Sequence, residues 1–290
     1  MGCKYRYAKA PMLIAAPNDW GVNLSLLLSD ERLPHLGGNK YHKISGYLAE
    51  ARRQGVQHLL TMAGPHSNHL RAFSAVIAQG EFTGTVLVRG EELNDSARHS
   101  EEIRGALHAG VRCIFVTREV YRQLRTARDA DTVRQLITVG ELPRSVFIPE
   151  GGHGPIGTVG VAAWAAQVQD FSDIFIACAT GTTCAGFLLD TAVSTRIWGI
   201  SVVRNESSVM QTISQLAPGH EQRFTLLNEY DQGGFARFGT AHAEFCERLS
   251  AEWGLTIDPV YVGKAAAAIA DRAQKGFING RALLVYTYNE

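Results

Sequence analysis

The chain has no excess of charge of either sign, since its 290 residues include 28 Lys and Arg and 28 Asp and Glu. Proteins that bind nucleic acid or anionic membranes usually present a basic surface, so the sequence disfavours both partners. No apolar run approaches the roughly 20 residues that span a bilayer, and residues 1–6 lack the apolar core of a signal peptide. We therefore expect a cytoplasmic protein whose partner is a small molecule.

Paired cysteines, internal repeats and low-complexity linkers are also missing. The five cysteines are scattered and form no C-x-x-C pair, so we expect neither a disulfide framework nor a metal site. What is present is a chain that is 46% hydrophobic and 19% charged. That balance predicts a sizeable core, in one large α/β unit or in two domains that share a cleft.

Short apolar runs alternate with longer segments of helical character. The expected strands cover residues 58–62, 85–89, 112–116, 145–149, 174–179, 197–202 and 282–287. The expected helices cover residues 41–54, 68–79, 96–108, 126–139, 158–169, 183–194, 241–253 and 263–275. Most strand runs are continuously apolar, which is typical of parallel strands covered on both faces. Open sheets of this kind bind ligands at the carboxyl ends of their strands.

Two segments in the first quarter of the chain suggest chemistry. Lys40 follows the glycine-rich turn Gly37-Gly38-Asn39, and a lysine whose pKa is lowered can act as a Schiff-base nucleophile. Alone, such a lysine is more often a solvated surface charge. Residues 63–69 join an expected strand to an expected helix. Ser67 or Asn68 there either caps the helix or, with the free N–H groups of its first turn, receives a carboxylate.

Two later segments have the same character. Residues 179–186 supply hydroxyls and glycines between an apolar strand and a helix. They suit a monophosphate, because neither a Walker A loop nor the G-x-G-x-x-G spacing is present. The alternative is an ordinary glycine turn. Tyr261 precedes a helix that Gly263 opens, where its phenol could serve as an acid, a base or a hydrogen-bond donor, or simply sit at a domain edge.

These segments together resemble one family. The matching motifs are Gly-Gly-Asn-Lys (37–40), Ser-Asn-His (67–69), Ile-Pro-Glu-Gly-Gly (148–152), Thr-Gly-Thr-Thr-x-Ala-Gly (180–186) and Asp-Pro-Val-Tyr-x-Gly-Lys (258–264). In this order and spacing they resemble the 1-aminocyclopropane-1-carboxylate deaminase and D-cysteine desulfhydrase group. That group belongs to the tryptophan-synthase-β-like, fold type II enzymes that use pyridoxal 5'-phosphate (PLP). The resemblance runs from about Leu26 to the C-terminus.

The resemblance implies a role for each matching residue. Lys40 would be the Schiff-base lysine and the base that removes the Cα proton. Asn68 would bind the cofactor's phenolic oxygen. Ser67 and the start of its helix, which includes Asn68, would receive the substrate carboxylate, with His69 nearby. Tyr261 would lie over the reacting substrate. The phosphate would be bound by Thr180, Gly181, Thr182 and Thr183.

The resemblance also implies an α/β fold of two lobes and a homodimer. Residues 1–43 and 150–290 would form the larger, PLP-binding domain, and residues 44–149 a smaller α/β domain inserted in it. The substrate would be a small amino acid.

Four departures from the family pattern bear on the reaction. Residues 27–30 retain only the acid of the family's Lys-Arg-Glu-Asp stretch, and residues 286–289 replace its His-Thr-Gly-Gly. A second active-site tyrosine falls on Phe235, and the deaminases' glutamate after the tyrosine is here Val262. Phe235 cannot transfer a proton, which argues against cyclopropane ring opening. Thr287 could bind the pyridine nitrogen in place of the missing carboxylate.

We therefore expect a PLP-dependent lyase or deaminase that performs α,β-elimination of the D-cysteine desulfhydrase type and gives a 2-oxo acid and ammonia. The alternatives on the same scaffold are 1-aminocyclopropane-1-carboxylate deamination, β-replacement, dehydration and racemisation. An alternative of another class is a PLP-binding protein with little catalysis.

Overall fold

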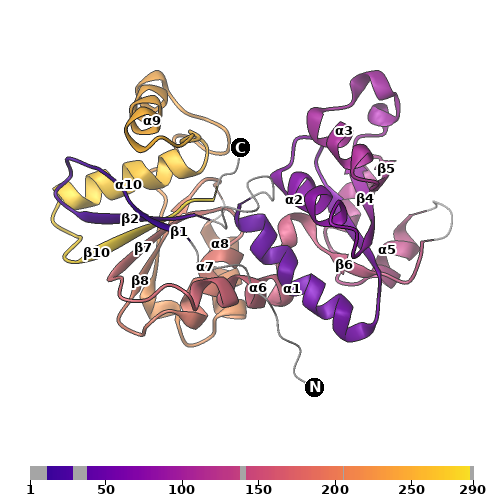
Figure 1. Cartoon of the computed structure of the whole chain (residues 1–290), viewed down its shortest axis with the longest axis horizontal. Helices are drawn as coiled ribbons and strands as arrows, with labels where there is room; N and C mark the ends of the chain where they lie inside the picture. Colours follow the sequence, from indigo (N-terminus) through magenta and orange to yellow (C-terminus); the bar gives the residue numbers. More distant parts are fainter. Residues whose placement is uncertain (1–11, 29–37, 138–141, 205, 288–290) are drawn as a thin grey trace. The chain divides into compact units, whose positions relative to one another are not determined.

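A computed structural model describes residues 12–28, 38–137, 142–204 and 206–287 of the chain. Residues 29–30, 37 and 288–289, which entered the motif comparison, lie outside the described residues. By their internal contacts, the residues divide into two compact units (Figure 1). Unit 1 combines residues up to 34 with residues 162–288, and unit 2 comprises residues 35–161. The domain boundaries expected at 43/44 and 149/150 stay a prediction.

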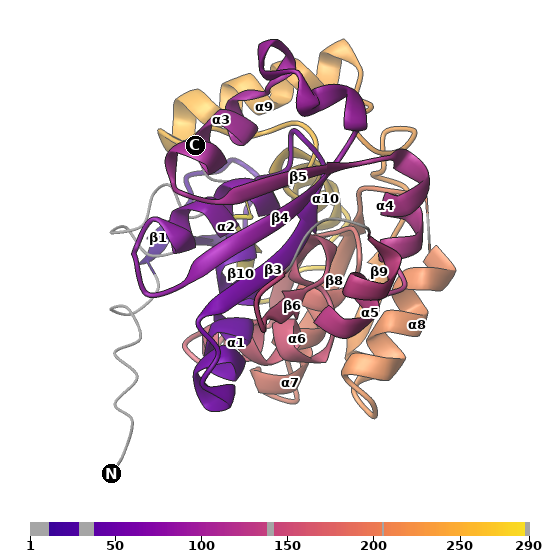
Figure 2. The ribbon, with the colours of Figure 1, turned by 90° about the vertical axis from the view of Figure 1, so that its right-hand side faces the viewer.

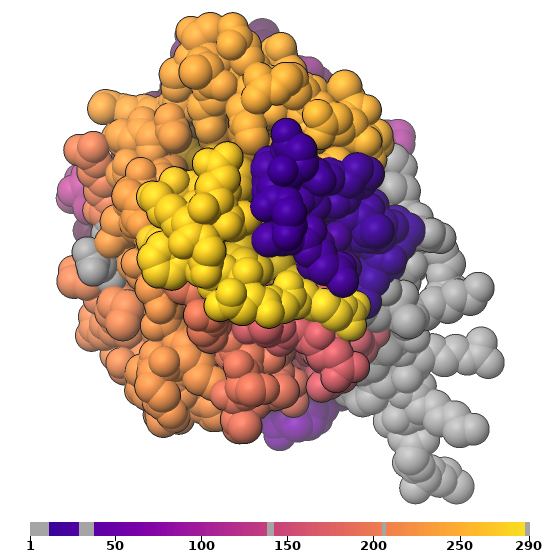
Figure 3. Space-filling view, turned by 90° about the vertical axis from the view of Figure 1, so that its left-hand side faces the viewer, coloured from indigo at the N-terminus to yellow at the C-terminus, as the bar shows by residue number. Residues whose placement is uncertain are grey.

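Unit 1 is built on a six-stranded sheet with the order β1-β2-β10-β7-β8-β9. These strands are β1 (Met12–Ala15), β2 (Asn23–Leu28), β10 (Arg281–Val285), β7 (Asp173–Cys178), β8 (Arg196–Ser201) and β9 (Phe224–Leu227). All neighbours pair in parallel except β1, which pairs with β2 antiparallel. The β1–β2 hairpin and β10 lie side by side in the space-filling view (Figure 3), although they come from opposite ends of the chain.

Helices cover both faces of this sheet (Figure 1). One face carries α9 (Thr240–Trp253) and α10 (Val262–Gln274), and the other carries α7 (Thr182–Asp190) and α8 (Glu206–Leu216). The first of these layers is a continuous apolar core in which Phe175 and Trp198 of the sheet pack with Leu249 and Ile269 of the helices. Every residue of β7 is buried, which explains why its sequence is apolar throughout.

Unit 2 contains a smaller, wholly parallel sheet with the order β5-β4-β3-β6 (Figure 2). Its strands are β3 (His58–Ala63), β4 (Thr83–Arg89), β5 (Arg112–Val116) and β6 (Val146–Ile148). One face packs on α1 (Asn39–Gln54), α2 (Asn68–Ile77) and α3 (Glu101–His108). The other face packs on α4 (Arg118–Leu124) and α5 (Ala130–Leu136). The helix α6 (Pro155–Ala165) follows β6.

The α/β fold class and the parallel sheets expected from the sequence are confirmed. All seven expected strands are present, with bounds that differ by no more than two residues at either end. The expected helix at 96–108 is a 3-10 turn (Ser96–Arg98) followed by α3, because Ser100 caps a new helix through its hydroxyl. The expectation for 126–139 was too long at its start, since Asp129 caps α5 and the separate helix α4 precedes it.

Candidate functional site

The candidate residues of unit 1 lie at one edge of its sheet. Because β2, β10, β7, β8 and β9 are parallel, their carboxyl ends share an edge. Residues 179–183 follow β7, residues 228–239 follow β9, and Thr287 follows β10. Tyr261 lies immediately before α10, the helix that leads into β10. Ligands bind at such edges in α/β proteins.

The segment after β7 has the geometry of an anion site. Gly181 has a φ of 83° and forms the N-cap of α7, a left-handed conformation that glycine adopts without strain. Thr182 and Thr183 are buried in the first turn, and the hydroxyls of Thr180 and Thr182 are 3.4 Å apart. The N–H groups and the positive dipole end of α7 favour a bound phosphate.

Thr287 has a buried hydroxyl without a hydrogen-bond partner among the described residues. The residue is 8% exposed, and its Oγ1 forms no hydrogen bond within the part of the chain that is described. A buried hydroxyl without a partner is costly. A bound ligand that supplies an acceptor or donor would remove this cost.

Tyr261 is held by the buried carboxylate of Asp258. That carboxylate accepts hydrogen bonds from the backbone N–H groups of Val260, Tyr261 and Val262 at 3.0, 2.6 and 3.1 Å. Burial raises the pKa of the Tyr261 phenol to about 12, and the charge of Asp258 adds to this effect. The phenol is therefore protonated at neutral pH and can donate a hydrogen bond.

In unit 2, Lys40 occupies the first turn of α1, directly after Asn39 and the N-cap Gly38. Gly38 has a φ of 56°, which explains why glycine stands before the helix. Burial lowers the pKa of the Lys40 ammonium to about 8. An appreciable fraction of the amine is therefore neutral near physiological pH, as a nucleophile or base requires.

Ser67 caps α2, since its Oγ accepts a hydrogen bond from the backbone N–H of His69 at 3.1 Å. The first turn of a helix has several N–H groups without an intrahelical partner, and the Ser67 cap uses one of them. The remaining N–H groups can still bind a carboxylate. Asn68 begins the helix and is half-buried.

His69 is neutral and buried, at 1% exposure. The Thr61 hydroxyl donates to the carbonyl oxygen of Ile148 at 2.8 Å, so it accepts from Nε2–H of His69 at 2.8 Å. This leaves the lone pair on Nδ1, which has no partner among the described residues. Burial, with the charges of Lys40 and Lys43, lowers the imidazole pKa to about 3. His69 therefore lies near Lys40 and offers an unused acceptor.

Sequence reasoning missed two residues that shape the site of unit 1. Lys264, quoted in the motif without a role, is fully buried and donates to the carbonyl oxygens of Asp231 and Gly234 at 2.8 and 2.9 Å. Asp231 was not identified at all. A lysine next to glycine at a helix start was the available signal, but its partners lie some thirty residues away in the sequence.

The residues present fit PLP in each unit. Unit 1 offers an anion site at α7 and the unpartnered hydroxyl of Thr287, and unit 2 offers a lysine with a lowered pKa. No group of three or more His, Cys, Asp and Glu side chains suited to a metal ion occurs among residues whose structure is described. Within the same residues, no helix is both long and apolar enough to cross a membrane.

The chain is similar over most of its length to named enzymes. No protein-family model matches it. It is 26% identical to a putative 1-aminocyclopropane-1-carboxylate deaminase of Pyrococcus abyssi over 92% of this chain and 84% of the relative. It is 28% identical to D-cysteine desulfhydrase of Salmonella choleraesuis over 87% of this chain and 82% of the relative.

The solved structure of a homologue of 1-aminocyclopropane-1-carboxylate (ACC) deaminase superposes on this chain with a TM-score of 0.70 at 21% identity. The superposition covers 97% of this chain and 92% of the homologue. This likeness confirms the fold type II architecture. The chain is thus similar over most of its length to enzymes of the 1-aminocyclopropane-1-carboxylate deaminase and D-cysteine desulfhydrase group, as its motifs predict.

Proposed function

We propose that the chain is a PLP-dependent lyase that eliminates a leaving group from Cβ of a small amino acid, as D-cysteine desulfhydrases do. The observation that carries this proposal is Lys40, a lysine in the first turn of α1 whose amine has a pKa of about 8. The names of the relatives support the same reaction class.

The cofactor would attach to the Lys40 amine. Its phosphate would bind at the N-terminal end of α7, to Thr180, Gly181, Thr182 and Thr183. Asn68 would bind its phenolic oxygen. The Thr287 hydroxyl would bind its ring nitrogen, which would satisfy a buried group that has no partner in the described part of the chain. When bound, PLP supplies an electron sink for the charge that develops at Cα.

The chain's own residues would bind the substrate and move its proton. The helix end at Ser67 and Asn68 receives the carboxylate, with His69 close by. The Lys40 amine, when it is free, would take the proton from Cα. Tyr261, protonated at neutral pH, donates a hydrogen bond to the substrate or to the departing group.

Ring opening of 1-aminocyclopropane-1-carboxylate is the second candidate, because several relatives carry that name. Two residues of this chain disfavour it. Phe235, whose ring lies 6.1 Å from that of Tyr261, has no proton to give. Val262 is fully buried and supplies no carboxylate beside Tyr261. We expect elimination to be much faster than ring opening.

The test is the visible absorbance of the purified wild type and of Lys40→Ala, followed by sulfide and pyruvate assays with D- and L-cysteine. The expected result is an absorbance band that the variant loses, and sulfide with pyruvate from one enantiomer. A band without any amino-acid response would favour a PLP-binding protein with little catalysis. Absence of the band after incubation with PLP would refute the proposal.

We further propose a cytoplasmic homodimer, following the family resemblance. Sedimentation of the loaded protein should give a mass near twice the 31.6 kDa of the chain. A monomeric mass at micromolar concentration would contradict this part of the proposal without affecting the reaction.

A further inference from the structure

The loop after β9 has an unusual backbone. Four residues in succession or nearly so have positive φ: Gln232 at 55°, Gly233 at 92°, Gly234 at 122° and Ala236 at 55°. Glycine tolerates this region, but Gln232 and Ala236 adopt it at a cost in free energy. Such a conformation persists only where the surroundings hold it in place.

Buried and charged groups hold this loop. The Lys264 ammonium donates to the carbonyl oxygens of Asp231 and Gly234, on both sides of the turn. The Asp231 carboxylate accepts from the backbone N–H of Gly233 at 2.7 Å and from Nε of Arg204 at 3.1 Å. Lys264 is fully buried, so its charge is satisfied chiefly by these carbonyl oxygens.

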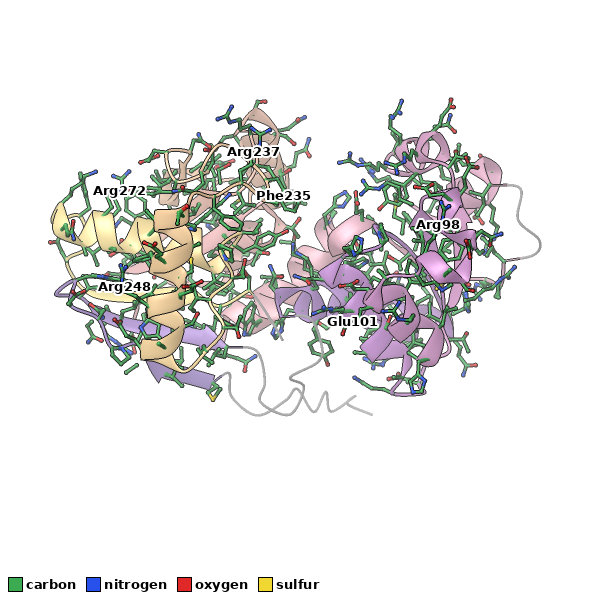
Figure 4. The ribbon with its side chains drawn as sticks, turned by 90° about the horizontal axis from the view of Figure 1, so that it is seen from above. Arg98, Glu101, Phe235, Arg237, Arg248 and Arg272 are labelled. Carbon is green, nitrogen blue, oxygen red and sulfur yellow. The ribbon has the colours of Figure 1, made fainter. Side chains whose placement is uncertain are left out.

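The result of this arrangement is an exposed aromatic ring. Phe235 lies between the two positive-φ segments and is 57% exposed (Figure 4). Its ring meets that of Tyr261 edge to face, with centroids 6.1 Å apart and planes at 66°. Strained backbone conformations are concentrated at active sites and ligand-binding segments, so the ring that this loop exposes is a candidate for a ligand contact.

We propose that Phe235 contacts the side chain of the substrate and selects amino acids with an apolar group on Cβ. Lys264 is the positioning residue that holds Phe235 against Tyr261. This inference rests on the proposed function, which places Tyr261 at the substrate. It narrows the substrate class from small amino acids to those with an alkyl or aryl substituent, such as thioethers of cysteine.

Atoms and electrons balance in the elimination from a cysteine thioether. The proton leaves Cα, and the Cβ–S bond breaks with its electron pair on sulfur. The sulfur departs as a thiol after taking up a proton. Water then hydrolyses the remaining enamine to pyruvate and ammonia. No oxidant or reductant is needed.

The first experiment measures binding, which does not depend on turnover. Calorimetric titration of the PLP-loaded protein with both enantiomers of alanine and norleucine gives the preference for an apolar side chain. We expect one enantiomer of norleucine to bind at least about tenfold more tightly than the matching alanine, since each buried methylene contributes severalfold. The preference should fall below about threefold in Phe235→Ala.

Phe238→Ala is the matched control, because Phe238 is a second exposed phenylalanine of the same loop, at 42%, whose ring lies 6.4 Å from that of His242, tilted by 49°. It should keep the wild-type preference. Lys264→Met should lose the preference as Phe235→Ala does, with its circular dichroism unchanged. If Lys264→Met fails to fold, Phe235→Ala still decides, because an exposed side chain is not needed for folding.

The second experiment compares pyruvate formation from S-benzylcysteine, S-methylcysteine, cysteine and serine. Higher kcat/KM for the thioethers, reduced selectively in Phe235→Ala, would support the inference. Equal affinity for alanine and norleucine in the wild type, or a preference that survives in Phe235→Ala, would overturn it even if cysteine yields pyruvate. Pyruvate from none of the four, with the norleucine preference intact, would refute the proposed reaction and leave Phe235 as the side-chain contact.

Discussion

At the scale of single residues, His69 shows how one buried hydroxyl determines the state of its neighbour. Thr61 donates its only proton to Ile148 and can only accept from the imidazole. Nε2 therefore bears the proton, and Nδ1 faces the protein interior as an acceptor without a partner among the described residues. Protonation of Nδ1 would place a positive charge in a buried site near Lys40 and Lys43, which explains the low pKa.

This histidine should make the protein sensitive to acid. Its pKa falls from 6.5 in the unfolded chain to about 3 in the fold. Between these values only the unfolded chain binds the proton, so stability falls as pH falls, by about 1.4 kcal/mol per pH unit. Above pH 6.5 the imidazole is neutral in both states, so its full contribution to the free energy of unfolding is present. In His69→Gln, urea unfolding between pH 4 and 6 should show a slope that is smaller by about 1 kcal/mol per pH unit. Parallel curves for the two proteins would contradict the assignment.

Lys40 should control how fast the cofactor attaches. Only the neutral amine reacts, and the pKa of about 8 means that its fraction rises with pH up to that value. The rate of PLP attachment to the cofactor-free protein should increase about tenfold from pH 6 to pH 7 and level off above pH 8. Stopped-flow absorbance measures this rate. A rate that still rises steeply between pH 9 and 10 would mean that the pKa of the Lys40 amine is not lowered.

At the scale of elements, glycines set the distance between α1 and α6 within unit 2. A Cβ at Gly160 would collide with the carbonyl oxygen of His42 and lie 2.8 Å from the backbone nitrogen of Gly46. Both partners are backbone atoms of α1, the helix that begins at Asn39 and carries Lys40. The helix with the lysine is therefore held by backbone contact, and its position cannot adjust to a larger residue.

Gly160→Ala should lower the free energy of unfolding by about 1–3 kcal/mol, because overpacking displaces α1. Gly105→Ala is the matched control, since Gly105 lies inside α3 and a Cβ there meets nothing within 4 Å. That change should stabilise the protein by about 0.5–1 kcal/mol. Urea unfolding measures both values, and equal effects at the two positions would contradict the close approach.

Some strands can be predicted from the sequence and others cannot. Buried parallel strands such as β7 were found because both faces are covered and every residue is apolar. The strands β1, β2 and β9 were missed. β1 alternates between half-buried and exposed residues, and β9 has only four residues at the sheet's edge. β2 lies inside the sheet but pairs with β10 from the other end of the chain, and pairing with distant segments leaves no local pattern in the sequence.

The features of the candidate site also differ in whether the sequence predicts them. The positions of Lys40, Ser67, Thr182 and Tyr261 at helix starts are predictable, because glycine or a capping residue marks each start, while their roles stay predictions. The bonds from Lys264 to Asp231 and Gly234 are not predictable, since a side chain that binds backbone carbonyls leaves no residue-type signature at the acceptor. Roles that depend on the path of the chain therefore required the structure.

At the scale of the whole molecule, each of the two units contains residues that the proposed function assigns to the cofactor. Unit 2 contains Lys40, and unit 1 contains the anion site at Gly181 and the hydroxyl of Thr287. Each unit has its own sheet and its own apolar core. Without the cofactor, the two units are expected to unfold with limited cooperativity, because each could fold around its own core.

PLP should therefore couple the unfolding of the two units. A ligand that binds only the folded protein stabilises it by about 2.7 kcal/mol at a free concentration of one hundred times Kd. Scanning calorimetry should show a broad or double transition for the cofactor-free protein and a sharper one, several degrees higher, with PLP. Lys40→Ala removes the covalent attachment but leaves the anion site at α7, so PLP should raise its transition much less. An identical increase in wild type and variant would show that the phosphate site alone binds the cofactor, and would remove Lys40 from the proposed attachment.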